Sequence, residues 1–253
     1  MRIVLIGTGN VATRLGIALR ARNAEIIQVF GRSETVTSQF ASTLGCNFTV
    51  NIKEIATDAD IYLMAVSDQA IAGLAADLHG KDGLIVHTAG SIPMEILASG
   101  SNNYGVFYPL QTLSKQKEVD FSTIPVCIEA NSNENLEKLR QLASTISEKV
   151  VVMNSEQRRQ IHLSAVFVCN FVNHLYSVGE KLLLDQNLDF DLLRPLIRET
   201  AEKAMLFSPP AVQTGPAVRG NKSVMDEHLK MLENHPQWHE LYDLISKDIR
   251  YFQ

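Results

Sequence analysis

One segment carries most of the information in this sequence: Arg2-Ile3-Val4-Leu5-Ile6-Gly7-Thr8-Gly9-Asn10-Val11-Ala12. An apolar strand runs directly into the pattern G-x-G-x-x-A, and residues 13–22 then have the spacing of a helix. Gly7 can form a tight turn, Gly9 lacks the Cβ that would keep a pyrophosphate from the backbone, and Ala12 lets the helix pack closely on the strand. A helix N-terminus presents N–H groups and a positive dipole end to phosphates, so the segment predicts a dinucleotide site; the alternative is a glycine-rich turn without a ligand.

The composition is that of an enzyme-sized globular protein. With 253 residues, 45% of them hydrophobic, the chain can bury one large core or two modest ones. The net charge of -5 argues against nucleic acid or an anionic membrane as a partner. Three scattered cysteines without a C-x-x-C pair indicate the reducing cytoplasm. We expect no signal peptide, and no apolar run approaching the roughly 20 residues of a membrane span.

The hydrophobic pattern changes near residue 153. Before it, short apolar runs alternate with amphipathic stretches, which predicts an α/β fold, a Rossmann-type doubly wound and mostly parallel sheet. The candidate strands are 3–6, 25–30, 61–66, 84–88, 106–108, 124–129 and 150–153. From Asn154 onward every segment has the pattern of a helix. We therefore predict a nucleotide-binding domain over 1–153 and an all-helical second domain over 154–253.

Four residues mark expected helix starts in the second domain. Asn154, with Gln157 three residues later, resembles a capping box for a long helix reaching about residue 184. Asp191 is the expected cap of a helix ending near residue 207. Asn221 and Pro236 are the expected starts of two more.

The end of the second strand indicates the cofactor. NAD-binding proteins of this type place an Asp or Glu there to hold the ribose 2′-hydroxyl. Here Arg32 and Ser33 follow the strand, and no carboxylate stands at its tip to repel a 2′-phosphate. A guanidinium can bind phosphate in a bidentate manner. The sequence therefore predicts NADP rather than NAD, although Arg32 could also be an ordinary solvated arginine.

Several short motifs together point to a family. They are Gly7-Thr8-Gly9-Asn10-Val11-Ala12, Gly31-Arg32-Ser33, Ala65-Val66-Ser67-Asp68 and Thr88-Ala89-Gly90-Ser91. They resemble the nucleotide domain of pyrroline-5-carboxylate reductase and of deazaflavin-dependent NADP oxidoreductases. The resemblance and the strand ends imply cofactor contacts from Gly7, Thr8, Gly9, Asn10, Val11, Arg32, Ser33, Ala65, Val66, Ser67, Ala89 and Gly90.

Later motifs are similar to those of an uncharacterised bacterial family of Rossmann-like NADP oxidoreductases. They are Tyr108-Pro109-Leu110-Gln111-Thr112, the run from Ile161 to Phe167, and the run from Thr214 to Asn221. Members of this family carry a helical C-terminal domain similar to that of 6-phosphogluconate dehydrogenase. The resemblance covers nearly the whole chain and implies nucleotide binding and a homodimer formed through the helical domain. It does not imply a particular substrate.

Two differences between this sequence and the related enzymes leave its reaction undetermined. Related hydroxyacid dehydrogenases have a catalytic Lys-x-x-x-Asn on the first helix of the second domain, but here Val166 lies four residues before Asn170. There is no lysine between Lys149 and Lys181. The glycine-rich, threonine-containing loop of pyrroline-5-carboxylate reductase is also not visible, and residues 214–221 stand in its approximate place.

Polar residues within the first helix of the second domain are the candidate catalytic groups. At about 100° per residue, His162, Asn170, Asn173 and Ser177 form one polar stripe. The stripe could satisfy hydrogen bonds at a subunit contact. Alternatively, His162 is a proton donor or acceptor, and Asn170 and Asn173 orient a substrate carbonyl or carboxylate. Arg219 could clamp a substrate anion or form a surface salt bridge.

Other candidates are expected at the carboxyl edge of the sheet, where ligands of open α/β folds bind. His87 could flank the nicotinamide or be a hydrogen-bonded residue at a strand end. Tyr108, Pro109, Gln111 and Thr112 are expected to line the same crevice. His235 and His239 lack a third ligand, so no metal site is predicted.

Two functions remain possible. The first is an NADP-dependent oxidoreductase acting on a small carbonyl, imine or hydroxy compound. The second is a nucleotide-binding sensor or structural protein that catalyses nothing, because fold alone does not establish chemistry.

Overall fold

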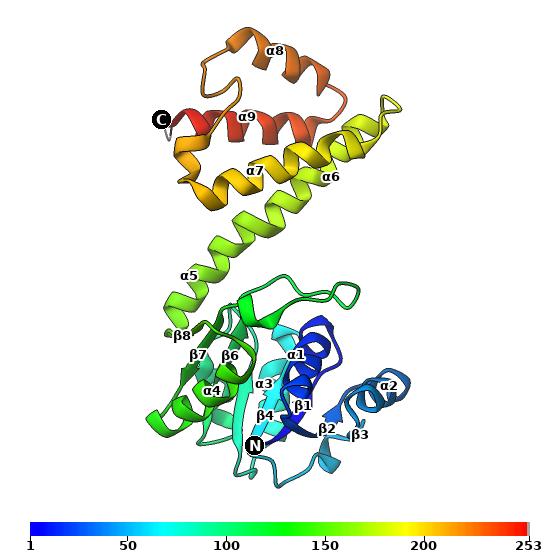
Figure 1. Cartoon of the computed structure of the whole chain (residues 1–253), viewed down its shortest axis with the longest axis vertical. Coiled ribbons are helices and arrows are strands. Elements are labelled where there is room, and N and C mark those ends of the chain that lie inside the picture. The colour runs from blue at the N-terminus through cyan, green and yellow to red at the C-terminus, as the bar shows by residue number, and fades with distance from the viewer. Residues whose placement is uncertain (252–253) are drawn as a thin grey trace. The chain divides into compact units, whose positions relative to one another are not determined.

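An eight-stranded sheet forms the first part of the computed structural model, which describes residues 1–251 (Figure 1). The strand order is β3-β2-β1-β4-β5-β6-β7-β8. The strands are β1 (Arg2–Ile6), β2 (Glu25–Phe30), β3 (Asn47–Thr49), β4 (Ile61–Met64), β5 (Leu84–His87), β6 (Tyr104–Pro109), β7 (Val126–Ala130) and β8 (Val150–Val152). All seven strands expected from the sequence are present, and β3 is an additional short strand.

The pairing of the strands creates a topological switch point. β1 pairs in parallel with both β2 and β4, and parallel pairing continues through β5 to β6. β7 is antiparallel to β6, and β8 is parallel to β7. The predicted mostly parallel Rossmann-type sheet is therefore confirmed. The chain first adds β2 and β3 on one side of β1 and then adds β4 and the later strands on the other side. The point between β1 and β4 where this order reverses is where such folds bind ligands.

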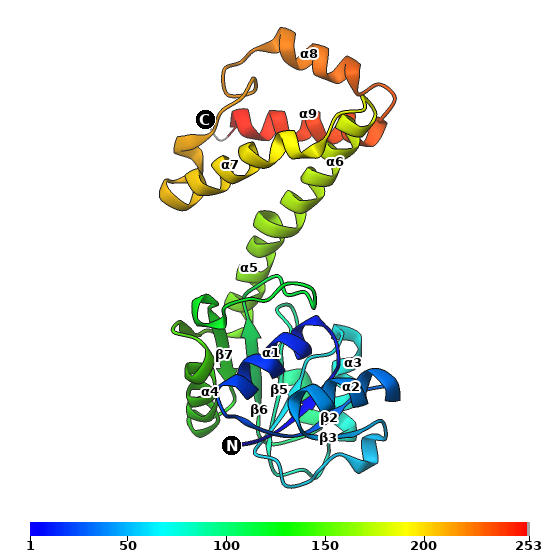
Figure 2. The same cartoon turned by 45° about the vertical axis from the view of Figure 1, so that its right-hand side comes forward.

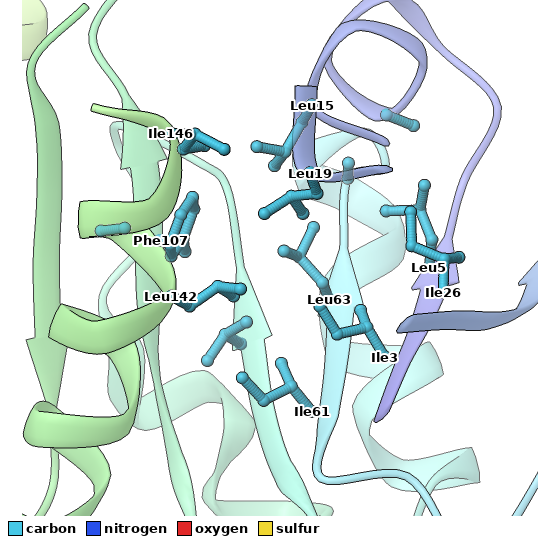
Figure 3. Close-up of a cluster of buried hydrophobic side chains, with 14 of the residues drawn as sticks. Ile3, Leu5, Leu15, Leu19, Ile26, Ile61, Leu63, Phe107, Leu142 and Ile146 are labelled. Atoms are coloured by element: carbon cyan, nitrogen blue, oxygen red, sulfur yellow. The ribbon is translucent and has the colours of Figure 1, made fainter. Parts of the chain in front are cut away.

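Alternate residues of the central strands pack on opposite faces of the sheet. Ile3, Leu5, Ile61 and Leu63 point to one hydrophobic cluster, which Figure 3 shows together with residues of α1 (Asn10–Ala21) and α4 (Asn133–Ile146). Their neighbours along the strands point to a second cluster, which includes residues of α3 (Asp68–Asp77). Both faces are covered, as the continuous apolar runs of parallel strands require.

The first compact unit extends beyond the sheet. It comprises residues 1–169 and also contains α2 (Glu34–Leu44) and α5 (Ser155–Ala165). The predicted domain boundary at residue 153 lies one residue after the last strand, which ends at Val152, but the division between compact units falls later, after Cys169. The reason is that the first turns of α5 are bonded to β7 and to the loop after β5, as described below.

The second unit begins at Asn170 and is helical with connecting loops throughout its described residues (Figure 2). Its main helices are α6 (Val172–Leu184), α7 (Arg194–Leu206), α8 (Lys222–Met231) and α9 (Pro236–Tyr251). Asn221 caps α8 and Pro236 begins α9, as predicted. The predicted cap at Asp191 is wrong: a short 3-10 turn (Phe190–Leu193), capped by Asp189, precedes α7, and the N-cap of α7 itself is Leu193.

A single long helix joins the two units along the chain. The capping box of Asn154 and Gln157 is formed, and the helix continues to Leu184 through a π-helical segment (Val166–Phe171). The helix has 30 residues, and an 18-residue window within it has a mean hydropathy of 1.2, so it meets the length and composition of a membrane span. Length and hydropathy alone are weak evidence for a span, because core helices of soluble proteins meet the same criteria.

Candidate active site

A cavity of about 520 Å³ lies at the switch point of the sheet. Its lining residues come from the end of β2, from the loops after β1, β2, β4 and β5, and from the helices α1 and α3. They are Gly7, Thr8, Gly9, Asn10, Val11, Phe30, Gly31, Arg32, Ala65, Val66, Ser67, Ala70, Leu74 and Thr88. Nine of the twelve predicted cofactor contacts are among them. The other three lie next to the lining in the sequence: Ser33 follows Arg32, and Ala89 and Gly90 are the two residues after Thr88.

The glycines of the first loop have different structural roles. Gly7 has φ +117°, and a Cβ there would lie 2.2 Å from the carbonyl oxygen of Ala65, so no other residue fits without a shift. A Cβ on Gly9 would meet no protein atom within 4 Å. Gly7 is therefore required by packing, whereas Gly9 faces open space at the start of α1, where a pyrophosphate could approach the backbone.

Two helices begin at this cavity without a side-chain cap. Gly9 is the N-cap of α1 and Ser67 is the N-cap of α3, and neither helix has a side-chain hydrogen bond at its cap. The first N–H groups of a helix need partners from outside the helix, and anions supply them well. The residues present thus fit a dinucleotide, with the pyrophosphate at the N-terminus of α1.

Arg32 lies at the rim of the cavity and is exposed. Its guanidinium forms no ion pair with any residue of the described chain, 1–251. The neighbouring Ser33 is the N-cap of α2, and its carbonyl accepts a hydrogen bond from Oγ1 of Thr37 at 2.6 Å. The Arg32 side chain therefore remains available to a ligand.

The loop that follows β5, residues 88–94, is held tightly. His87 is fully buried, and its Nδ1 accepts a hydrogen bond from the backbone N–H of Ala89 at 3.1 Å. Burial lowers the pKa of His87 to about 4, and the charge of Arg158 acts in the same direction. His87 is thus a neutral residue that shapes the turn. Of its two predicted roles, the structure favours the hydrogen-bonded residue at a strand end.

His162 lies directly on this loop. A Cβ on Gly90 would be 2.5 Å from Nδ1 of His162, so the imidazole contacts the backbone of Gly90. The same Nδ1 is 3.1 Å from the hydroxyl of Tyr108, and the two rings are edge to face. Burial raises the pKa of Tyr108 to about 12, so its hydroxyl stays protonated at neutral pH. The structure therefore brings together three predicted residues, Gly90, Tyr108 and His162.

A buried ion pair supports these residues, and sequence reasoning missed it. Arg158 is fully buried and bonds to the carboxylate of Glu129 in β7 and to the carbonyl of Ile92. Glu129 also accepts hydrogen bonds from the N–H and the hydroxyl of Ser155, at 2.7 and 2.8 Å. A glutamate within the apolar strand β7 was the available signal, whereas Arg158 stands among polar residues in the first turns of α5 and gave none.

The remaining candidates do not join this cluster in the first unit. Asn170, Asn173, Ser177 and Arg219 are exposed residues of the second unit. The hydroxyl of Ser177 donates to the carbonyl of Asn173 at 3.3 Å, within the same helix. Arg219 forms no salt bridge with any residue from 1 to 251, so that alternative for it is not supported. Their roles in substrate binding stay predictions.

The residues after Tyr108 and the paired histidines have local partners. The side-chain oxygen of Gln111 accepts the N–H of Thr112 at 2.8 Å. His235 stacks on Trp238 with ring centroids 4.4 Å apart and lies 3.5 Å from Asp185.

Two family models match the chain. Residues 2–90 match the family described as NADP oxidoreductase coenzyme F420-dependent. Residues 124–249 match a domain of unknown function, DUF2520. The first match contains the glycine loop, Arg32 and Gly90, and the second contains Glu129, Arg158 and His162. No curated protein matches the sequence.

Solved structures place the chain in a family. A protein described as "putative NADP oxidoreductase BF3122" from Bacteroides fragilis is 44% identical, with 99% of this chain and 98% of that one covered and a TM-score of 0.94. The chain belongs to the family of this oxidoreductase. Protein TM1727 from Thermotoga maritima is 22% identical, with 100% and 99% covered and a TM-score of 0.84. A pyrroline-5-carboxylate reductase from Coxiella burnetii is 17% identical, with 98% and 96% covered and a TM-score of 0.59, so the fold expected from the sequence resemblance is confirmed.

Proposed function

We propose that this protein is an NADP-dependent oxidoreductase that transfers a hydride between the nicotinamide and a small carbonyl, imine or hydroxy compound. The observation that carries the proposal is the cavity at the switch point, with Gly9 facing open space and Arg32 at the rim. Membership of an oxidoreductase family supports it.

The choice of NADP over NAD rests on Arg32. Its exposed guanidinium is uncommitted within the described chain and follows β2, where a 2′-phosphate would lie. Ser33 adds a hydroxyl and the N-terminus of α2. The description of the Bacteroides fragilis relative and that of the N-terminal family model both include NADP, which supports the same choice.

His162 is our candidate for the residue that exchanges with the substrate the proton that accompanies the hydride. NADPH, when bound, supplies the hydride; a carbonyl or imine that accepts it must also receive a proton. Nδ1 of His162 is engaged with Tyr108, so Nε2 is the nitrogen that would exchange a proton with the substrate. Tyr108 orients the ring. Asn170, Asn173 and Arg219 stay candidates for binding the rest of the substrate.

Isothermal titration with NADPH and NADH tests the proposal. We expect NADPH to bind more tightly than NADH. Arg32→Ala should weaken the binding of NADPH about ten- to hundredfold, because a charge-assisted hydrogen bond contributes about 1.5–3 kcal/mol. Arg140→Ala is a matched control, since Arg140 pairs with Glu137 on the exposed face of α4. Equal binding of both nucleotides to the native protein would reject the assignment of NADP.

The non-catalytic alternative requires a second measurement. NADPH oxidation is followed across a panel of keto acids and cyclic imines. Tight NADPH binding without turnover of any compound would favour a nucleotide-binding sensor.

The proposal includes a cytoplasmic homodimer. Cys46, Cys127 and Cys169 are all free thiols, as a reducing compartment requires. Apolar side chains are exposed on α7, with Met205 85% and Leu206 76% accessible. Exposed apolar surface of this kind marks contacts with other chains, and we expect a second copy to cover it.

A further inference from the structure

The loop 88–94 is fixed at three points that surround Gly90. At its start, the N–H of Ala89 donates to Nδ1 of His87 at 3.1 Å. In the middle, the carbonyl of Ile92 accepts a hydrogen bond from the guanidinium of Arg158. At its end, the N–H of Met94 donates to the hydroxyl of Ser155 at 3.2 Å. Two of the three anchors come from α5, the helix that also carries His162.

Arg158 and His162 are four residues apart on α5 and therefore share one face of the helix. Arg158 bonds to Ile92 on this face, and one turn later His162 rests on Gly90 of the same loop. Glu129 binds both the guanidinium of Arg158 and the first turn of α5 at Ser155, which fixes the helix to the sheet. These bonds thus fix both the rotation of α5 about its own axis and the distance of this helix from Gly90.

The chemistry of the ion pair between Arg158 and Glu129 indicates that it positions other groups and adds little to the stability of the fold. A buried ion pair usually adds little net stability, because removing two charges from water costs about as much as their attraction returns. Nε of Arg158 also has no hydrogen-bond partner within residues 1–251, which adds to the cost. The planar guanidinium, however, fixes two acceptors at defined directions, which a lysine ammonium does not.

We infer that Arg158, with Glu129 and Ser155, is the positioning network that holds the imidazole of His162 against Gly90 and Tyr108. The inference rests on the proposed function only in assigning His162 to proton transfer. The geometry of the network is independent of the identity of the cofactor and the substrate.

Hydrogen exchange and NMR of the full chain test the network. Arg158→Lys keeps the charge opposite Glu129 but loses the planar fork. The double variant Arg158→Gln with Glu129→Gln removes both charges and keeps hydrogen-bonding groups. The control is Arg159→Lys, because Arg159 is the exposed neighbour of Arg158 on the same helix.

In both network variants the loop amides of Ala89 and Met94, which are bonded to His87 and Ser155, should exchange at least about tenfold faster than in the native protein, while exchange in β1 and β4 stays unchanged. The ring-proton signals of His162, assigned by comparison with His162→Gln, should shift because the ring loses its hydrogen bond to the hydroxyl of Tyr108. NADPH affinity should fall by less than about tenfold, because the glycine loop is untouched and only Thr88 of the loosened loop lines the cavity. Arg159→Lys should change none of these.

The inference is overturned if folded network variants show native exchange in residues 88–94 and native signals for His162. Ser155→Ala keeps the test decisive if the other variants do not fold, because it removes only the hydroxyl that links Glu129 and Met94. It should loosen residues 88–94 to a smaller extent, and native exchange there would again overturn the inference. If the native protein fails to bind NADPH, the proposed function falls while the exchange and NMR results still judge the network.

Discussion

The imidazole of His162 lies so close to Gly90 that a Cβ on this glycine would come within 2.5 Å of Nδ1 and 2.7 Å of Cγ. Real Cβ atoms essentially never approach other atoms so closely. The contact brings a titratable side chain from α5 onto a backbone segment that leads away from the cofactor cavity. The imidazole of His162 thus occupies the space that a side chain at residue 90 would need.

Gly90→Ala should displace His162. The added methyl group occupies the position of the ring, so the hydrogen bond between His162 and Tyr108 should break and NADPH-dependent turnover should fall at least about tenfold. Gly73→Ala is the matched control, because Gly73 lies in α3, where a Cβ would meet no atom within 4 Å, and should tolerate alanine. Native turnover and native His162 NMR signals in Gly90→Ala would contradict the role of this contact.

Gly7→Ala and Gly9→Ala should separate folding from nucleotide binding. At Gly7 the φ of +117° and the close carbonyl of Ala65 should cost about 2 kcal/mol or more of unfolding free energy. At Gly9 the methyl group meets no protein atom, so stability should be nearly native, while NADPH affinity should fall at least about tenfold. Thermal melts and titration calorimetry measure the two effects. Native NADPH affinity in Gly9→Ala would show that the pyrophosphate does not approach this loop.

His87 should make the protein sensitive to mild acid. Its pKa is about 4 in the folded state and 6.5 ordinarily, so between these values the unfolded chain binds more protons and stability falls as the pH falls. From pH 7 to pH 5 this group should remove about 2 kcal/mol from the free energy of unfolding. His87→Gln lacks the titration, and its amide oxygen can still accept the N–H of Ala89. Urea melts at both pH values should therefore show a smaller acid loss in the variant, and an equal loss would contradict the burial effect.

The protein should be a dimer in solution, with twice the mass of the 28.1 kDa chain by light scattering. Met205→Glu combined with Leu206→Lys should yield a folded monomer, because charges do not tolerate burial in an apolar interface. Val50→Lys is the control, since Val50 is exposed in the first unit. A monomeric native protein at micromolar concentration would reject the dimer, and a dimeric double variant would move the interface away from α7.

The sheet was predictable because each central strand is a short, continuous apolar run ending at a glycine or a polar turn. β3 escaped detection because its three residues, Asn47, Phe48 and Thr49, contain only one apolar side chain and only Thr49 is buried. The glycine loop and Arg32 were predictable because local spacing determines their positions. Their assembly in one cavity with Ser67 and Thr88 follows from the strand order.

The supporting residues could not be predicted from local patterns. Arg158 and Glu129 are 29 positions apart in the sequence, and no periodicity links a helix residue to a particular strand residue. The predicted polar stripe assumed a uniform α-helix, but the π-helical segment (Val166–Phe171) lies between His162 and Asn173. Because i→i+5 bonding adds a residue to the turn, residues beyond this segment are rotated by about 100° relative to their positions in a uniform α-helix.

The three thiols differ in a way that has a practical consequence. Burial raises the pKa of Cys127 to about 11, so at pH 8 only about one Cys127 in a thousand is the reactive thiolate. Burial also raises the pKa of Cys46. Cys169 is half-buried and sits midway along the 30-residue helix. A maleimide fluorophore added at neutral pH should label Cys169 first, so the natural sequence already contains a site for a spectroscopic reporter on this helix.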